Sequence, residues 1–75
     1  MNAKGEKVVI EGAGVMGASI AQVYAKAGYE VCVYDIEERS FDRCRDLIAL
    51  NQRNLVAEGL STTEASEEIK GRIAF

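Results

Sequence analysis

The sequence predicts an α/β fold: a truncated, doubly wound parallel sheet with the element order β-α-β-α-α and a final strand that has only begun. Two observations predict it. Short apolar runs at residues 8–10 and 29–34 alternate with segments of helical periodicity. A glycine-rich turn over residues 12–17 joins the first run directly to the first helical segment. A complete fold of this kind has two βαβαβ halves, so residues 1–75 are expected to form the N-terminal portion of one domain.

The first half of the chain is predicted to form one βαβ unit. The Val8–Ile10 run is compatible with a strand buried on both faces. Apolar residues then recur at helical spacing, namely Met16, Ile20, Val23, Tyr24 and Ala27. Gly28 follows where a left-handed helix terminator belongs. A second strand is expected over residues 29–34, ending at Asp35, with a right-handed crossover between the strands.

The second half of the chain is predicted to be mainly helical. A long helix is expected over about residues 37–58, closed by Gly59. Its apolar stripe consists of Phe41, Cys44, Ile48 and Leu55. The Ser61–Glu64 segment has the spacing of a capping box, which predicts a short helix from there to about Gly71. Residues 72–75 are predicted to begin a third strand.

The composition argues against several classes of partner. A net charge of −3 without basic runs disfavours nucleic acid and anionic membrane surfaces. No apolar stretch approaches the roughly 20 residues of a spanning helix, and the polar residues 1–7 are not a signal peptide. Cys32 and Cys44 lack CxxC spacing and the chain has no histidine, so we expect reduced packing thiols and no metal site. These observations favour a cytoplasmic location.

The glycine-rich turn matches the GxGxxG fingerprint of a dinucleotide-binding Rossmann unit in its full context. A strand precedes it, a helix and a second strand follow, and an acid lies 18 residues beyond the last glycine. Gly12 permits the tight turn, Gly14 lets backbone amides approach a pyrophosphate, and Gly17 lets the helix pack closely on the strand. The pyrophosphate is expected at the helix N-terminus, where unpaired N–H groups favour negative charge. The predicted cofactor-binding residues are Gly12, Ala13, Gly14, Val15, Met16, Gly17 and Asp35.

Asp35, at the end of the second strand, is expected to accept hydrogen bonds from the adenosine ribose hydroxyls. A carboxylate there would repel a 2′-phosphate, which favours NAD over NADP. Three alternatives stay open at this point. Arg39 could favour NADP, the glycines could form a turn without a ligand, and Asp35 could be the N-cap of the next helix. An FAD site is less compatible with Met16 and with the residues that follow Gly17.

Glu11, directly before the first glycine, is unfavourable for an anionic ligand. At roughly 7 Å and an effective dielectric constant of about 20, its repulsion of one phosphate charge is about 2 kcal/mol. Binding would then be weakened more than tenfold. The penalty falls if the carboxylate turns into solvent, pairs with a lysine or is protonated.

The segments 12–22, 27–31 and 34–36 resemble the N-terminus of the 3-hydroxyacyl-CoA dehydrogenase family, with the closest likeness to its bacterial 3-hydroxybutyryl-CoA members. The likeness extends over about residues 7–75. It implies an oxidoreductase that interconverts 3-hydroxyacyl-CoA and 3-oxoacyl-CoA with NAD(H), in fatty-acid or butyrate metabolism. The family's catalytic His–Glu pair cannot be placed, because the chain has no histidine. The resemblance therefore implies no catalytic residue within this chain, and an acyl-CoA substrate and homo-oligomeric state for a longer protein.

The predicted long helix departs from the family's pattern. Some members place a polar and a basic residue of this helix against the CoA; here Asn51 matches the polar one, but Glu58 replaces the base. Three arginines of the same helix are interpreted as a solvated face rather than a phosphate patch, namely Arg43, Arg45 and Arg53. The alternative function is a complete, non-catalytic module that binds a nucleotide or associates with itself. Self-association is expected in either case, because so small a core leaves sheet edges uncovered.

Overall fold

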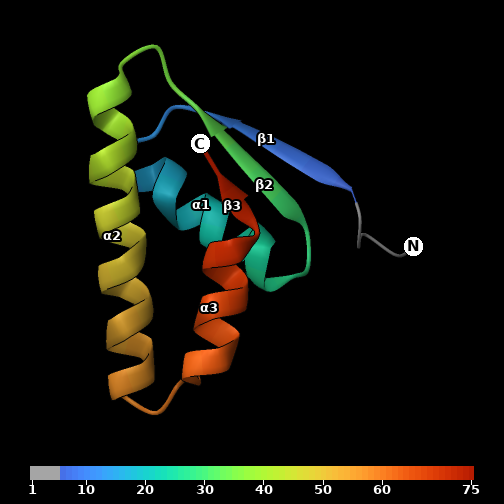
Figure 1. Ribbon diagram of the computed structural model, residues 1–75, viewed down its shortest axis with the longest axis vertical. Coiled ribbons are helices and arrows are strands. Elements are labelled where there is room, and N and C mark those ends of the chain that lie inside the picture. The colour runs from blue at the N-terminus through green and yellow to red at the C-terminus, as the bar shows by residue number, and fades with distance from the viewer. Residues whose placement is uncertain (1–5) are drawn as a thin grey trace.

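The computed structural model describes residues 6–75 and contains three strands and three helices (Figure 1). The elements are β1 (Lys7–Glu11), α1 (Val15–Lys26), β2 (Glu30–Tyr34), α2 (Glu38–Ala57), α3 (Thr63–Gly71) and β3 (Ile73–Ala74). The predicted order of elements is therefore confirmed. Most of the polar N-terminal stretch that was predicted not to be a signal peptide lies outside the described residues. Among these residues, no helix is long and apolar enough to cross a membrane.

The three strands form a parallel sheet in the order β1-β2-β3. Lys7 pairs with Glu30 at the start of the sheet, and Val31 pairs with Ile73 on the other side of β2. Both connections therefore run in the same direction across the sheet. Right-handed crossovers in one direction place their helices on the same face, so the whole core lies between that face and the helices.

The two faces of the sheet differ in burial. The side chains directed at the helices belong to the core and are Val8, Ile10, Val31, Val33 and Ile73. On the opposite face the register aligns Val9, Cys32 and Ala74 in one row. Val9 is 62% exposed there, so the prediction that this strand is buried on both faces is wrong for the described residues. The alternation follows from the two-residue period of a strand with helices on one side only.

Helix α1 is present as predicted, but it does not bury its large apolar residues. Met16 is 76% exposed, and Val23 and Tyr24 are also exposed. The buried positions are Gly17, Ala18, Ala21 and Ala25. Small side chains let the helix axis approach the sheet closely, so the residues that mark the helical period in the sequence are not the residues that make the core.

Both helix terminators predicted from glycine are confirmed. Gly28 has φ +102° and Gly59 has φ +75°, the left-handed conformation that favours glycine. After α1, the amide of Tyr29 donates to the Tyr24 carbonyl oxygen at 3.1 Å, and Gly28 donates to Ala25. The Tyr24 and Tyr29 rings then meet edge to face at 5.4 Å. These bonds and the accompanying ring contact define a Schellman motif, which ends the helix and directs the chain into β2.

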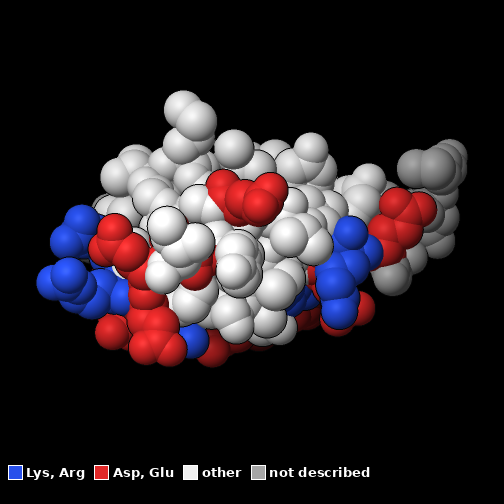
Figure 2. All heavy atoms as spheres, turned by 90° about the horizontal axis from the view of Figure 1, so that it is seen from above, with Lys and Arg blue, Asp and Glu red and all other residues white. Residues whose placement is uncertain are grey.

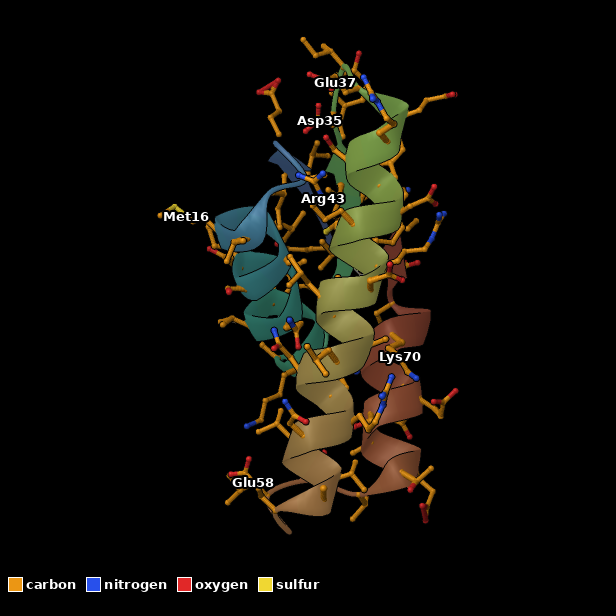
Figure 3. The ribbon with its side chains drawn as sticks, turned by 90° about the vertical axis from the view of Figure 1, so that its left-hand side faces the viewer. Met16, Asp35, Glu37, Arg43, Glu58 and Lys70 are labelled. Atoms are coloured by element: carbon orange, nitrogen blue, oxygen red, sulfur yellow. The ribbon has the colours of Figure 1, made fainter. Side chains whose placement is uncertain are left out.

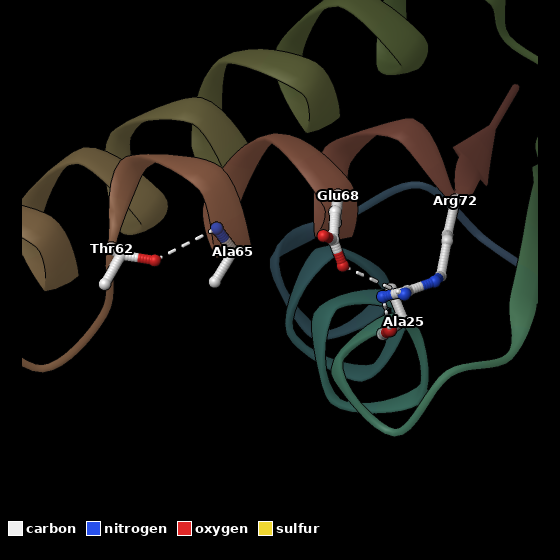
Figure 4. Close-up of polar contacts among 5 residues, drawn as sticks. All are labelled: Ala25, Thr62, Ala65, Glu68 and Arg72. Atoms are coloured by element: carbon white, nitrogen blue, oxygen red, sulfur yellow. Dashed lines mark hydrogen bonds and ion pairs between the residues drawn. The ribbon is translucent and has the colours of Figure 1, made fainter.

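The start of α3 corrects the predicted capping box. Thr62 is the N-cap, and its hydroxyl oxygen accepts a hydrogen bond from the Ala65 amide at 3.1 Å (Figure 4). The Ser61 hydroxyl instead lies against the Thr62 carbonyl oxygen at 3.5 Å. The helix therefore begins one residue later than the Ser61–Glu64 pattern predicted, because two adjacent hydroxyl residues could fill the same role and only the Thr62 hydroxyl accepts the Ala65 amide.

A polar chain of side chains connects all three helices inside the core. Ser66 of α3 donates to Gln52 Oε1 at 2.9 Å, and Gln52 Nε2 donates to Gln22 Oε1 of α1 at 2.7 Å. Gln22 Nε2 completes the chain on the Ala18 carbonyl oxygen at 3.1 Å. Gln52 is only 3% exposed, and among the described residues no buried side-chain polar atom lacks a partner. These hydrogen bonds fix the positions of α2 and α3 along α1.

Arg72 holds the C-terminal end of α1 against α3. Its guanidinium donates to the Ala25 carbonyl oxygen at 2.9 Å and reaches the Glu68 carboxylate at 3.3 Å (Figure 4). The Ala25 carbonyl oxygen already accepts the Gly28 amide at the helix end, so the Arg72 bond is an additional one. The bond therefore ties the residue just before β3 to the first crossover.

Candidate dinucleotide-binding site

The glycine-rich turn lies at the carboxyl end of β1 and leads into α1. Gly12 has φ +106°, which a residue with a side chain rarely adopts. Its amide donates to the Tyr34 carbonyl oxygen at 2.7 Å, which joins the turn to the end of β2. The turn is thus held by backbone groups of both strands, at the edge of the sheet where open α/β folds bind their ligands.

Gly17 is required by packing within the protein itself. A Cβ atom at Gly17 would overlap the carbonyl oxygen of Gly12 and would also lie near the Ile10 side chain. At Gly14, in contrast, a Cβ atom would meet nothing within 4 Å. The space beside Gly14 is open, so nothing within the described protein requires a glycine there. The role expected of Gly14 from the GxGxxG fingerprint, close approach of a ligand to the backbone, therefore stays a prediction.

The N-terminus of α1 presents uncompensated positive charge. Gly14 is the N-cap and has no side-chain capping bond, and the first turn contains no acidic residue. The first helical hydrogen bond of this end runs from the Ala18 amide to the Gly14 carbonyl oxygen at 2.9 Å, so the preceding amides lack an intrahelical acceptor. Val15 and Met16 are exposed beside these amides. Free amides and the helix dipole together make this end suited to a phosphate.

Asp35 connects the end of β2 to the glycine-rich turn. Its Oδ2 atom accepts a hydrogen bond from the Ala13 amide at 2.8 Å, and its Oδ1 atom accepts one from the Glu37 amide at 3.0 Å. These bonds hold the pKa of the Asp35 carboxyl below its usual range, and the bond from Ala13 has the largest effect. Partial desolvation acts in the opposite direction. The carboxylate is therefore ionised and fixed in place before any ligand binds.

The alternative that Asp35 is the N-cap of the next helix is wrong. The N-cap of α2 is Glu37, which makes no side-chain capping bond. Asp35 instead forms a local turn with the Glu37 amide two residues ahead. Figure 3 shows Asp35 and Glu37 at the same end of the molecule, above the start of α1, on which Met16 is labelled.

A hollow of about 200 Å³ lies between the carboxyl ends of β1 and β2. It is lined by Glu11, Gly12, Tyr34, Asp35 and Ile36. The end of the molecule seen in Figure 2 carries acidic side chains in its middle and both acidic and basic ones at its sides. Glu11 is exposed and shares this hollow with Asp35, which places its negative charge beside the position expected for the adenosine ribose.

The sequence of this chain matches the family model described as "3-hydroxyacyl-CoA dehydrogenase, NAD binding domain" over residues 7–75. The chain belongs to the 3-hydroxyacyl-CoA dehydrogenase family. The part of the family that it matches is the NAD-binding domain, so the predicted cofactor is NAD, as the fingerprint indicated. The site fits this cofactor, because the open space at Gly14, the free amides of α1 and the ionised Asp35 carboxylate lie around one turn.

Relatives of known sequence and of known structure support the same family assignment. The chain is 39% identical over 69 residues to a probable 3-hydroxybutyryl-CoA dehydrogenase of Deinococcus radiodurans, covering 92% of this chain and 24% of that protein. A crystal structure of 3-hydroxybutyryl-CoA dehydrogenase from Escherichia coli K12 superposes with a TM-score of 0.87 at 35% identity, covering 92% of this chain and 15% of that one. The (S)-3-hydroxybutyryl-CoA dehydrogenase from Ralstonia eutropha gives the same TM-score at 29% identity, with 92% and 24% covered. The chain thus spans about a quarter or less of these relatives.

The structure also separates the residues of α2 that the sequence grouped together. Asn51 and Glu58 line one groove of about 360 Å³ between α1 and α2, together with Ser19, Gln22, Asn54 and Leu55. Arg45 lies elsewhere: it pairs with Asp42 at 3.4 Å and stacks over the Phe75 ring at 4.5 Å. Arg53 lines the groove between α2 and α3. All three arginines are exposed, as the interpretation of a solvated surface predicted, but Arg45 and Arg53 lie in different surroundings.

Two features of the site were not found from the sequence. The Ala13–Asp35 bond joins residues 22 apart, and the Gly12–Tyr34 backbone bond joins the turn to β2. The only available signal was the position of Asp35 at the end of a strand parallel to the first. In parallel strands the carboxyl ends meet at one edge, so such a carboxylate can reach the turn.

Proposed function

We propose that residues 12–17 and Asp35 bind NAD(H), with the pyrophosphate on the free amides of α1 and the adenosine ribose on the Asp35 carboxylate. The observation that carries this proposal is the pair of hydrogen bonds that fixes Asp35 between the glycine-rich turn and the start of α2. A carboxylate accepts bonds from both ribose hydroxyls and repels a 2′-phosphate, so the site is proposed to prefer NAD(H) over NADP(H). Arg39 is exposed on the first turn of α2 and is the residue that would instead favour NADP(H).

For the protein to which the chain contributes, we propose the interconversion of 3-hydroxyacyl-CoA and 3-oxoacyl-CoA. The bound nicotinamide supplies a hydride acceptor or donor. The role of the residues described is to bind and orient the dinucleotide, since the chain contains no histidine for general acid–base chemistry. Residues 1–75 are thus proposed to be the N-terminal portion of the NAD-binding domain, with proton transfer and acyl-CoA binding located outside it. The cytoplasmic location stays a prediction from composition.

The binding proposal is tested by titrating NADH into the purified chain and following nicotinamide fluorescence, with NADPH in parallel. Asp35→Ala is expected to weaken NADH binding by at least tenfold, because ribose hydroxyls and the Ala13 amide both lose their acceptor. Glu58→Ala is the matched control, because Glu58 is an exposed acid at the end of the molecule opposite Asp35 (Figure 3). A folded chain that binds no NADH, or binds it equally well in both variants, would contradict the proposal.

A second proposal is self-association, and the exposed face of the sheet favours it. The row of Val9, Cys32 and Ala74 lies on the open face of the sheet, and none of the described strands pairs with the outer edge of β1. We expect both surfaces to contact another copy of the purified chain. Sedimentation velocity at increasing concentration tests this directly. Dimers or larger species that dissociate on dilution are expected, whereas a folded monomer at high concentration would rule the proposal out.

A further inference from the structure

Arg43 lies on the side of α2 that faces α1. Positions 43, 47, 51 and 54 are spaced by four, four and three residues, so they share one face of the helix. Asn51 and Asn54 line the groove against Ser19 of α1, which fixes the orientation of that face. Arg43 therefore belongs to the α1-facing side rather than to a separate surface.

Arg43 is also level with the glycine-rich turn. α1 and α2 both begin at the end of the molecule where β1 and β2 finish, so they run in the same direction (Figure 1). Ser19 lies beside Asn51 in the groove. Arg43 is eight residues before Asn51 on α2, and α1 begins at Val15, four residues before Ser19, so both positions lie toward the end of the molecule that holds the turn. Figure 3 shows the same arrangement, with Arg43 directed from α2 toward the turn, below Asp35.

Within the described part of the chain, Arg43 makes no ion pair, as is also true of Arg39 and Arg53 on the same helix. The ion pairs there join Arg45 to Asp42, Lys70 to Glu67 and Arg72 to Glu68. Arg45 is further engaged by the Phe75 ring. Arg43 is exposed and is thus available to an anion that enters beside the turn.

The charge balance of the site favours such a cation. Glu11 and Asp35 line the hollow beside the turn, and a dinucleotide adds two phosphate charges. The N-terminus of α1 offers the equivalent of about half a positive charge, which does not offset these groups. A guanidinium can form two parallel hydrogen bonds to phosphate oxygens and stays protonated at every relevant pH.

We propose that Arg43 binds the adenosine-side phosphate of the dinucleotide and offsets the negative charge of Glu11. This inference rests on the proposed NAD(H) site and names a further residue of it. The phosphate lies on the side of the turn that faces α2, between the Asp35 carboxylate and the α1 amides. Arg43 is therefore a binding residue of this site and not part of a solvated surface.

The test compares Arg43→Met and Arg43→Lys with Arg53→Met, a matched control on the same helix that lines the groove between α2 and α3. Circular dichroism establishes that each variant is folded. Arg43→Met is expected to raise the Kd for NADH about tenfold and to reduce its dependence on salt, because one phosphate contact is lost. Arg43→Lys should recover part of the affinity, and Arg53→Met should bind as the unaltered chain does.

Three outcomes would overturn the inference in distinguishable ways. If Asp35→Ala loses NADH while Arg43→Met retains full affinity, the NAD(H) site stands and Arg43 is not part of it. If Arg43→Met weakens NADPH much more than NADH, the cation recognises a 2′-phosphate instead of the shared adenosine-side phosphate. If the folded, unaltered chain binds neither nucleotide, the proposed function fails and the inference fails with it.

Discussion

The two halves of this chain are held together by different kinds of contact. In the β1–α1–β2 unit, glycine and alanine bring the helix onto the sheet, and the turn is held by backbone bonds and one carboxylate. In the α2–α3 pair, larger side chains and the Gln22–Gln52–Ser66 polar chain make the contacts. The first half leaves the amides at the start of α1 without a side-chain cap, whereas the second positions one helix against another.

This difference shows where each half is sensitive to substitution. At Gly17 the turn has no room for an added atom, so even one methyl group is costly there. The hydrogen-bonded side chains between the helices instead require a partner for every buried oxygen and nitrogen. Four predictions follow from this contrast, beginning with the largest expected effect.

Gly17→Ala tests the packing of the first half. The new Cβ atom would overlap the Gly12 carbonyl oxygen, so the free energy of unfolding is expected to fall by about 3 kcal/mol, with loss of NADH binding. Gly71→Ala is the control, because a Cβ atom at Gly71 meets nothing within 4 Å. Urea unfolding of both variants is the measurement. Equal stability of the two would show that the close approach of α1 to the turn is not required.

Gln52→Leu tests the polar chain of the second half. The substitution leaves Gln22 Oε1 without its donor and the Ser66 hydroxyl without its acceptor, which should cost about 1–3 kcal/mol of unfolding free energy. The double variant Gln52→Leu with Ser66→Ala removes one orphaned group and should recover part of the loss. If the Gln52→Leu protein is as stable as the original, these hydrogen bonds make no net contribution to the free energy of unfolding.

Thr62→Ala and Ser61→Ala distinguish the two candidate caps of α3. Only the Thr62 hydroxyl accepts the Ala65 amide, so its loss should cost about 1 kcal/mol and lower the melting temperature. Ser61→Ala should have a much smaller effect, because its hydroxyl makes only a long contact with the Thr62 carbonyl. Thermal unfolding by circular dichroism measures both. The reverse ranking would restore the Ser61–Glu64 capping box.

The Asp35 carboxyl predicts a stability change confined to acid pH. Because its pKa is lower in the folded chain than in the unfolded one, the folded state holds fewer protons at acid pH. The stabilisation is complete above the unfolded pKa of about 3.9 and is lost as the pH falls through the depressed folded value. Asp35→Asn should therefore be less stable than the original near neutral pH, with the difference shrinking below pH 4. A constant difference from pH 7 to pH 2.5 would show that the carboxylate bonds do not cause it.

The two cysteines show that burial could be predicted from the sequence in the second half of the chain and not in the first. Cys44 lies on the apolar stripe of α2 and is buried, as its helical spacing predicted, and desolvation raises the pKa of its thiol. Cys32 occupies a run that resembles a strand buried on both faces, yet it lies half-buried on the open face of the sheet. Periodicity indicates which residues share a face, but only the packing shows which face is covered.

The sequence by itself determined the order of elements, the two glycine helix ends and the position of the glycine-rich turn. These follow from local rules: left-handed φ at Gly28 and Gly59, the missing Cβ at Gly17, and β-branched runs between helical segments. Only the tertiary structure decided that α1 buries its alanines instead of its large apolar residues, because that depends on the distance between helix and sheet. It also decided that Asp35 reaches Ala13 and that Gln52 joins Gln22 to Ser66. Those contacts join residues far apart in the chain, and no local pattern carries their geometry.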